Sequence, residues 1–486
     1  MKRILIPLAL MAYFISGAQE IRYPSEVRKA FESADEKACQ SIGSKPLIGI
    51  PEALPERSVA VLEAGGIPVM VPGNLDSEEY AVWCSRLDGL SIGDRFVTEG
   101  NEQALYLYKA AIDRNLPVLG RNALMDKINA GLWRSKKSAS STEGLINDAI
   151  LYRKASELHK RIFTLDTHAD LPCGYKDGYH LGRRAVNQVS LRKMDEGGLD
   201  GTFIVCFLGQ KEKKDEGEAS LWCEEMLRTI RADIDSNAAY CSLATGPEDA
   251  LAAKREGKKA CFIGIENGFC IGNDISNIRK YADLGVRYIT LSHTWDNHIC
   301  HTSSHHSADT TLGLTLFGIQ AVKEMNRCGI LVDCSHTSSG TFWDCLNLSQ
   351  APVICSHSGC KALFDHDRNL TDDQLRALAG KGGVVQIYAV WNFQGEEERG
   401  IDIETFLDHI DHAVNVAGID HVGIGIDMDG GGGYTGIFGA NDAINITIGL
   451  LKRGYSPNDI AKIWSGNFFR VMKEAEKVAS ELRNGN

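Results

Sequence analysis

The residues of this sequence best suited to chemistry are histidines and carboxylates that follow short apolar runs. Six runs end in such a group, and together they supply His168, Asp170, Glu266, His293, His336, His357 and Asp427. Imidazole nitrogens and carboxylate oxygens are usual ligands of zinc, and the same groups transfer protons in catalysis. If the fold brings the ends of these runs together, the sequence predicts a metal site.

The spacing of these residues favours two metal positions. His168 and Asp170 are two residues apart, so in an extended strand their side chains point to the same side and one cation can bind both. Glu266 follows the apolar run FIGI, where a carboxylate is costly to bury unless it meets a cation, a donor or solvent. A carboxylate can also bridge two metals. His336 and His357 each end a run as a Ser-His pair and would complete a second position.

Taken singly, each of these histidines would more often be a hydrogen-bonded core or surface residue than a ligand. Four histidines and three carboxylates at the ends of such runs are hard to explain in that way, so we predict metal binding. A second group of histidines lies in a stretch rich in Ser, Thr and Asp. We expect this stretch to be a solvated loop beside the active site; its histidines are His298, His301, His305 and His306.

Eight strand-like runs must position these residues, and helical stretches lie between them. The runs are IFTLDTHAD, GTFIVCFLG, ACFIGIENG, VRYITLSH, GILVDCSH, APVICSHS, GGVVQIY and HVGIGIDMD. Eight β-then-α units predict an α/β fold of the (β/α)8 TIM-barrel type over residues 136–486, with the carboxyl ends of the strands on one face. An open doubly wound sheet is the alternative, but no GxGxxG motif follows the first run.

A smaller, truncated α/β domain is expected before the barrel, over residues 19–135. Short apolar runs there alternate with helical patterns, which indicates a small parallel sheet, and the polar segment RSKKSASSTE at 134–143 marks the boundary. The stretches GIPEALPERSVAVLEAGGIPVMVPGN, DGLSIGD and LPVLGRNALMDKINAG resemble class I glutamine-amidotransferase-like hydrolases of the γ-glutamyl peptidase type. That family has a nucleophilic cysteine just after PVLG, where this chain has Asn122, so the resemblance implies a degenerate domain.

Seven motifs of the barrel region carry a more specific resemblance: DTHADLP, GIENG, LSHTWDN, LVDCSHTS, PVICSHS, RNLTDDQL and GIGIDMDG. In this order, over residues 161–473, they resemble the renal (membrane) dipeptidase family, the M19 metallopeptidases of the amidohydrolase superfamily. The resemblance implies two zinc ions per chain. It assigns His168 and Asp170 to one ion, His336 and His357 to the other, and Glu266 to a bridge between them.

The same resemblance assigns the catalytic and substrate-binding groups. His293 would polarise the scissile carbonyl, Asp427 would shuttle the proton, and Arg368 would hold the C-terminal carboxylate of the substrate. The implied reaction is hydrolysis of dipeptides, including those with a C-terminal D-residue, by a metal-bridging hydroxide. From the residues alone, the alternative for Arg368 is a surface residue paired with Asp367 or Asp372.

Two other functions remain open at this stage. Another amidohydrolase on the same scaffold, such as a deacylase of N-acyl amino acids or a β-lactam hydrolase, would use the same metals. A non-catalytic peptide-binding protein is the second alternative, although every metal-type residue is retained. One departure from the family pattern is mild: Asn267 follows Glu266 where many relatives carry glycine.

Composition limits the class of binding partner, and the N-terminal residues indicate the cellular compartment. The chain has 486 residues, 43% of them hydrophobic, and a net charge of −12, and it has no long Lys/Arg run that would attract nucleic acid. Lys2 and Arg3, the apolar run 4–15 and the small residues 16–18 predict a signal peptide over residues 1–18. We therefore expect a periplasmic or extracellular enzyme that acts on small peptides and has no transmembrane anchor. A homodimer remains open.

Cysteine usage gives two expectations for an exported chain of this kind. The thiols inside apolar runs should be buried rather than bridged: Cys206, Cys261, Cys334 and Cys355. The better disulfide candidates are Cys223, Cys270, Cys300, Cys328, Cys345 and Cys360, with no connectivity implied.

Overall fold

The computed structural model describes residues 142–182, 187–210, 215–307, 309–396 and 401–485, together with four short strands nearer the N-terminus. Contacts divide the chain into two compact units, residues 1–155 and 156–486. The predicted signal peptide, Asn122 and most of the predicted boundary segment lie outside the described residues. The last two positions of that segment, 142 and 143, already belong to helix α8 (Thr142–Arg161).

The four strands of the first unit form a parallel sheet. They are β1 (Leu47–Gly49), β2 (Val69–Met70), β3 (Arg95–Val97) and β4 (Val118–Leu119), in the order β2-β1-β3-β4. Three of them lie in apolar runs that predicted a small parallel sheet, while β3 begins just after the run DGLSIG. The resemblance of this region to γ-glutamyl peptidases stays a prediction.

The second unit contains the predicted eight-stranded parallel barrel. Its strands are β5 (Leu165–Ala169), β6 (Gly201–Phe207), β8 (Lys259–Glu266), β9 (Val286–Thr290), β10 (Leu331–Asp333), β11 (Ile354–Cys360), β13 (Val384–Ile387) and β14 (Val422–Ile424). They follow one another around the sheet in sequence order, and each falls in one of the eight predicted runs. The chain beyond β14 returns to β5, because Ala169 bridges Met428 and the Asp170 amide donates to the Met428 carbonyl at 2.7 Å. This closure excludes the open doubly wound sheet.

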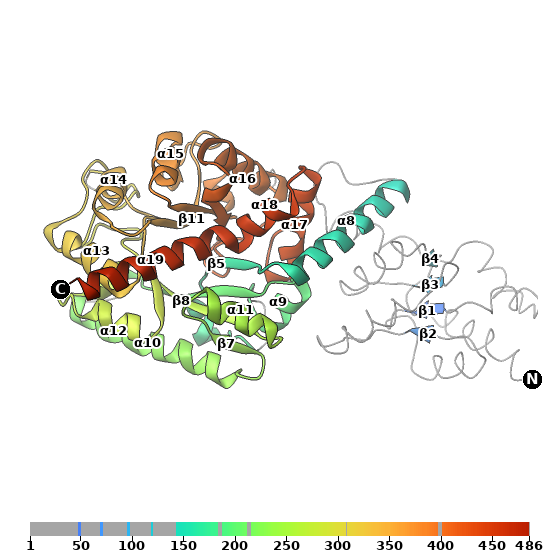
Figure 1. The fold of residues 1–486 in the computed structure, drawn as a ribbon, viewed down its shortest axis with the longest axis horizontal. Coiled ribbons are helices and arrows are strands. Elements are labelled where there is room, and N and C mark those ends of the chain that lie inside the picture. The colour runs from blue at the N-terminus through green and yellow to red at the C-terminus, as the bar shows by residue number, and fades with distance from the viewer. Residues whose placement is uncertain are drawn as a thin grey trace, which may run out of the picture. The chain divides into compact units, whose positions relative to one another are not determined.

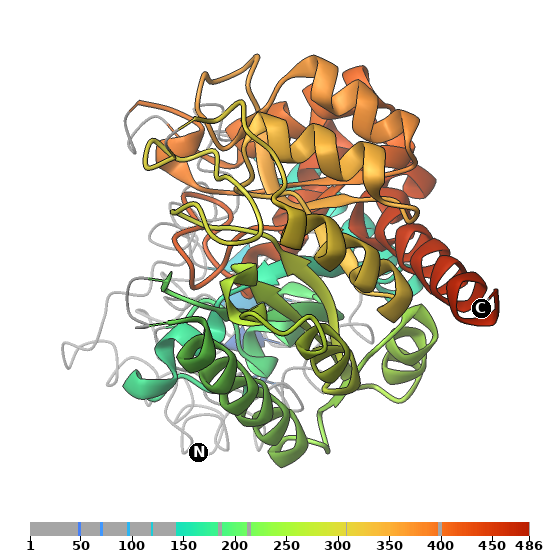
Figure 2. The ribbon, with the colours of Figure 1, turned by 90° about the vertical axis from the view of Figure 1, so that its left-hand side faces the viewer.

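Helices surround the sheet; most of them connect successive strands, and the last three follow β14 (Figures 1 and 2). They are α9 (Leu191–Gly197), α10 (Glu216–Ser236), α12 (Asn277–Asp283), α13 (Leu316–Cys328), α14 (Ser339–Leu348), α15 (Asp372–Gly380), α16 (Ile403–Ala417), α17 (Ala443–Lys452), α18 (Pro457–Ala461) and α19 (Asn467–Asn484). Side-chain caps fix several helix starts: the Thr315 hydroxyl accepts from the Gly318 amide, and Thr371 forms a capping box with Gln374.

Several short elements were not predicted. Strand β7 (Cys241–Leu243) pairs with β8 and is followed by α11 (Pro247–Arg255), while β12 (Asn369–Leu370) pairs with the end of β11. The remaining short helices are η1 (Leu171–Asp177), η3 (Gly268–Ile271), η4 (Trp391–Phe393), η6 (Ile419–His421), η7 (Ala440–Asp442) and η8 (Lys462–Gly466).

An apolar cluster seals the amino end of the barrel. The first residues of four strands, Leu165, Leu331, Ile354 and Val384, pack in one buried cluster with side chains of α19. In Figure 1 this helix crosses the whole unit towards the C-terminus. Because this end is filled with hydrocarbon, polar side chains inside the barrel gather at the opposite, carboxyl end of the strands.

The twelve cysteines of the described residues are all free thiols, so the expectation of bridges among the six disulfide candidates is not met in this structure. The four thiols expected in the core, at 206, 261, 334 and 355, are buried as predicted. None of the helices in the described ranges combines the length and apolar character needed to cross a membrane.

A buried histidine, His409, makes the free energy of unfolding depend on pH. The Nδ1 atom of His409 accepts the Cys360 amide at 3.0 Å, and burial, with a smaller contribution from His412, lowers its pKa to about 4. The folded state therefore favours the neutral ring. Its stabilising contribution is complete above the unfolded-state pKa of about 6.5 and is lost as the pH falls towards 4, up to about 3 kcal/mol.

We predict that His409→Asn, which offers an amide oxygen near the position of Nδ1, weakens this acid dependence. The measurement is the free energy of unfolding by denaturant between about pH 7 and pH 4.5, compared with the parent and with His305→Asn in an exposed loop. Equal slopes for the parent and His409→Asn would show that the buried ring does not carry this dependence.

Candidate metal centre

Glu266, the last residue of β8, is the centre of a cluster of histidines. Its Oε1 atom lies 3.0 Å from Nε2 of His336, 3.2 Å from Nε2 of His357 and 3.9 Å from Nε2 of His293. Its Oε2 atom lies 3.6 Å from Nε2 of His168. The two oxygens of one carboxylate therefore face different histidines, as a bridging ligand would.

The barrel brings these residues together from separate strands. His168 lies in β5, Glu266 in β8 and His357 in β11, while the other groups follow the ends of β5, β9, β10 and β14. The convergence predicted at the carboxyl ends is present. Possible ligand atoms approach one another within 4.8 Å in three overlapping groups: His168 with Glu266 and His357, Glu266 with His293 and His336, and His168 with Asp170 and Asp427.

Two buried atoms in this cluster have no hydrogen-bond partner, Nε2 of His168 and Oδ1 of Asp170. A buried polar atom without a partner is costly, and both atoms are lone-pair donors on residues predicted to share one cation. His336 and His357 meet in a similar way, because their Nε2 atoms are 2.9 Å apart and both face Glu266. The donor set and its geometry fit divalent cations bound by nitrogen and oxygen.

The electrostatics of the cluster favour positive charge beside its carboxylates. Burial would lower the pKa of His168, but the carboxylates of Asp170 and Glu266 raise it well above its usual value, so a cation bound there would replace a proton. Burial lowers the pKa of His336 and of His357 well below the usual value, so both rings are neutral and can donate a lone pair to a metal. Burial would raise the pKa of Glu266, but His293 and His168 hold it well below its usual range. Burial, reinforced by neighbouring carboxylates, raises the pKa of Asp427. A cation would offset the repulsion among these carboxylates.

Backbone strain is concentrated around the cluster. Four non-glycine residues in the described part of the chain have positive φ, namely Asn267 (80°), His336 (66°), Asp427 (70°) and Asp429 (62°). Such conformations cost energy and persist where the surroundings enforce them, commonly at active sites. Asparagine suits the conformation at position 267, since it is among the few residues other than glycine that tolerate this region.

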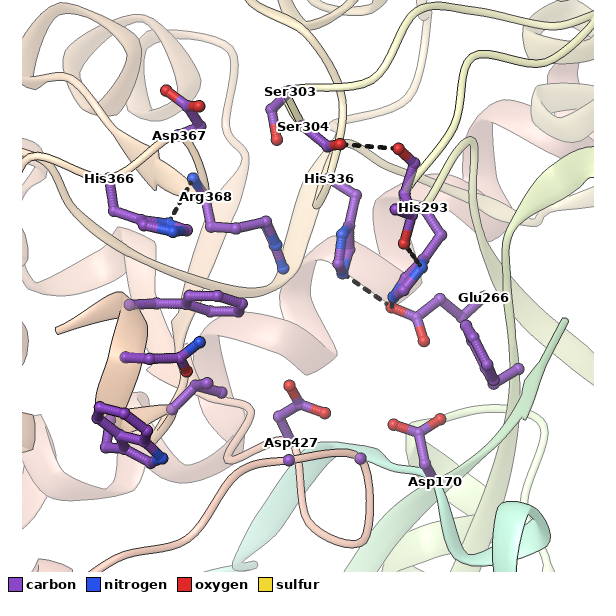
Figure 3. A pocket seen from close by; sticks show the side chains of 18 of the residues that line it. Asp170, Glu266, His293, Ser303, Ser304, His336, His366, Asp367, Arg368 and Asp427 are labelled. Carbon is purple, nitrogen blue, oxygen red and sulfur yellow. Dashed lines mark hydrogen bonds and ion pairs between the residues drawn. The ribbon is translucent and has the colours of Figure 1, made fainter. Parts of the chain in front are cut away.

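A pocket of about 790 Å³ opens over the cluster. Figure 3 shows Asp170, Glu266, His336 and Asp427 facing its interior. Gly430 also lines it, and a methyl group at this position would collide with the carboxylates of Asp170 and Asp427. His168 and His357 are buried behind the pocket surface.

Arg368 lies in the same pocket and is only 7% exposed. Its Nη2 atom donates to the His357 carbonyl at 3.0 Å, its Nε atom has no partner, and its guanidinium lies 5.8 Å from the centre of the Tyr388 ring. The alternative of a surface arginine paired with Asp367 or Asp372 is therefore wrong. A buried cation facing a pocket is suited to binding a carboxylate.

Other pocket residues were not predicted from the sequence. They include Cys173, Phe207, His366, Trp391, Phe393 and Asp429. Only Asp429 had a sequence signal, as the second carboxylate of the DMDG motif. Phe207 is the last residue of β6, and the others come from loops and short helices without a periodic pattern. In the loop after β9, His305 lines the pocket and His306 stacks on Trp295, which agrees with the expected loop beside the site.

The fold and the cluster define a class: a parallel (β/α)8 barrel with a histidine–carboxylate metal centre at the carboxyl ends of its strands, as in barrel metallohydrolases. The chain belongs to the membrane dipeptidase family, peptidase family M19, whose pattern matches residues 152–486. This membership confirms the predicted family and the prediction of a metallopeptidase of the dipeptidase type.

Individual relatives agree with this assignment. An uncharacterized dipeptidase of Schizosaccharomyces pombe is 38% identical over 356 residues, which cover 68% of this chain and 84% of that protein. Dipeptidase 3 of Macaca fascicularis is 31% identical over 355 residues, covering 68% and 69%. Among solved structures, the probable dipeptidase PvdM of Pseudomonas aeruginosa is 26% identical with a TM-score of 0.64, covering 68% of this chain and 99% of that one.

Proposed function

We propose that this dipeptidase binds two zinc ions and hydrolyses dipeptides with a free C-terminal carboxylate. The observation that carries the proposal is the convergence of five ligand-type side chains with Glu266 at their centre: its Oε2 faces His168, and its Oε1 faces His336 and His357. His168 and Asp170 would hold one ion, His336 and His357 the other, and Glu266 would bridge them. When bound, zinc supplies a Lewis acid and lowers the pKa of water.

The residues around the ions would perform the remaining chemistry. His293, whose Nε2 lies 3.9 Å from Glu266, would donate a hydrogen bond to the oxygen of the scissile carbonyl. Asp427, on the pocket wall beside Asp170, would accept the proton of the attacking water and return it to the leaving amine. Both groups lie at strand ends, where the barrel fixes their positions.

Arg368 would set the substrate class. Its buried guanidinium would bind the C-terminal carboxylate of the substrate. A single residue would then separate this carboxylate from the scissile peptide bond. Since a D-residue carries the same carboxylate, we include dipeptides with a C-terminal D-residue among the substrates. Deacylation of N-acyl amino acids is the alternative on this scaffold, because those compounds also end in a carboxylate.

Metal content tests the zinc proposal. We expect about two zinc ions per chain in the purified protein, and a strong loss of both zinc and activity in Glu266→Gln, because an amide bridges cations poorly. Elemental analysis of the folded proteins is the measurement, with the exposed Glu248→Gln as control. Full zinc occupancy in Glu266→Gln would contradict the bridging role.

Steady-state kinetics test the role of Arg368. Arg368→Ala should raise KM for dipeptides about 10- to 100-fold with zinc content retained, because one charge-assisted contact to the substrate is lost. The parent should cleave a C-terminally amidated dipeptide poorly, and the variant should no longer distinguish amide from acid. Arg376→Ala, on the surface of α15, is the control.

A paired substrate panel distinguishes the alternatives. It compares L,L- and L,D-dipeptides with N-acetyl amino acids of the same side chains. Faster hydrolysis of the N-acetyl compounds would favour the deacylase, and retained preference for the free acid in Arg368→Ala would show that another group binds the carboxylate.

We also propose that the enzyme acts outside the cytoplasm. The basic start, apolar run and small residues of positions 1–18 support export. Expression of the full chain in a bacterium, followed by N-terminal sequencing of the protein from the periplasm or medium, should give a chain that begins at Gln19. Retention of the uncleaved chain in the cytoplasm would contradict export.

A further inference from the structure

A buried carboxylate that belongs to neither the predicted ligands nor the pocket lies directly behind the histidines. Asp333, the last residue of β10, is fully buried and accepts four hydrogen bonds. Its Oδ1 atom accepts the amides of Ser335 (3.0 Å) and Ser356 (2.8 Å), and its Oδ2 atom accepts the hydroxyls of Thr290 and Ser356. The donors come from β9, from the chain after β10 and from β11.

The bond from Ser356 has a consequence for the next residue, His357. A serine hydroxyl has one hydrogen, and here it is donated to Asp333. The Nδ1 atom of His357 lies 2.9 Å from the same hydroxyl oxygen, so this contact requires the hydrogen to be on Nδ1. The Nε2 atom is then left with its lone pair, and it points towards Glu266 at 3.2 Å. This is the tautomer that binds a metal through Nε2.

His168 is supported by a different group. Its Nδ1 atom lies 2.8 Å from the hydroxyl of Tyr288, which also lies 3.1 Å from the Thr167 carbonyl. The Ser356 oxygen is more distant from His168 Nδ1, at 3.5 Å. A change at Ser356 would therefore act mainly through His357.

We propose that Asp333 and Ser356 act as a positioning relay that fixes the tautomer and orientation of His357 for zinc. The inference rests on the proposed role of His357 as a zinc ligand. Asp333 touches neither substrate nor metal in this arrangement. It holds the Ser356 hydroxyl in its donating orientation, and Ser356 in turn holds the ring. Removing such support from a metal-binding histidine typically costs 10- to 100-fold in metal affinity.

The chain offers a matched pair of variants for the test. Ser356→Ala and Thr290→Val each remove one hydroxyl that donates to Oδ2 of Asp333. Only the first also removes the contact to His357. The probe is Zn²⁺ alone, titrated into metal-free protein in competition with a chromophoric chelator, and the thermal unfolding midpoint of each metal-free protein is measured alongside.

We expect Ser356→Ala to bind zinc about 10- to 100-fold more weakly than the parent and Thr290→Val to stay within about threefold of it. Thr290→Val should lower the unfolding midpoint of the metal-free protein because it loses one buried hydrogen bond, and Ser356→Ala should lower it somewhat further because it also loses the contact to His357. This combination would separate a role in positioning the ligand from a general contribution to stability.

Two results would overturn the relay and leave the proposed function standing. Equal zinc affinity in Ser356→Ala and the parent would show that His357 needs no such support, and equal weakening in both variants would assign the effect to packing around Asp333. Failure of the parent itself to bind zinc would overturn the proposed function and the relay with it. Normal binding by the parent and Ser356→Ala would overturn the relay alone.

Discussion

The burial of one carboxylate at the end of β8 constrains the whole carboxyl face of the barrel. Glu266 is 3% exposed, and an isolated charge at such a position would be prohibitively costly. The histidine nitrogens around it come from other strands and loops, and a cation held between them and the carboxylate would offset its charge. Each of these histidines lies in a different strand or just beyond its end, so the cluster ties together β5, β9, β10 and β11: His168, His293, His336 and His357.

The strained residues show how the loops enforce this arrangement. His336 has a φ of 66°, and its carbonyl is held by the Ser303 amide at 2.8 Å and the Thr302 hydroxyl at 2.9 Å. Asp427 has a φ of 70°, and its carbonyl accepts the Gly432 amide at 2.8 Å. The left-handed conformation costs energy at both positions, and neighbouring loops supply the hydrogen bonds that maintain it. The strained backbone thus lets the side chains of His336 and Asp427 face the pocket, which a regular strand conformation would not allow.

The sequence predicts the barrel and its cluster because both depend on a pattern that is local. Each of the eight runs is apolar and six of them end in a histidine or a carboxylate, and closure of the barrel follows from the number of runs. Contacts that depend on three-dimensional proximity could not be predicted. Asp333 stands inside the LVDCSH motif, but nothing in the sequence shows that it meets Ser356 and Thr290. The burial of Arg368 could not be predicted from the sequence either, and only the family resemblance suggested that this residue binds the substrate carboxylate. Strand β7 was missed because three residues carry no periodicity.

Strand β11 couples the metal centre to the substrate site. Three of its successive carbonyls are used by other elements: the Thr167 hydroxyl donates to Ser356 at 2.9 Å, Arg368 to His357 at 3.0 Å, and the Tyr388 amide to Ser358 at 3.1 Å. The strand that presents His357 to the cluster therefore also anchors the guanidinium that faces the pocket. A displacement of β11 would move a proposed metal ligand and the proposed carboxylate-binding group together. The hydrogen bond from Arg368 to the His357 carbonyl would thus keep the proposed carboxylate-binding group at a fixed distance from a proposed metal ligand, which suits a substrate of fixed, short length.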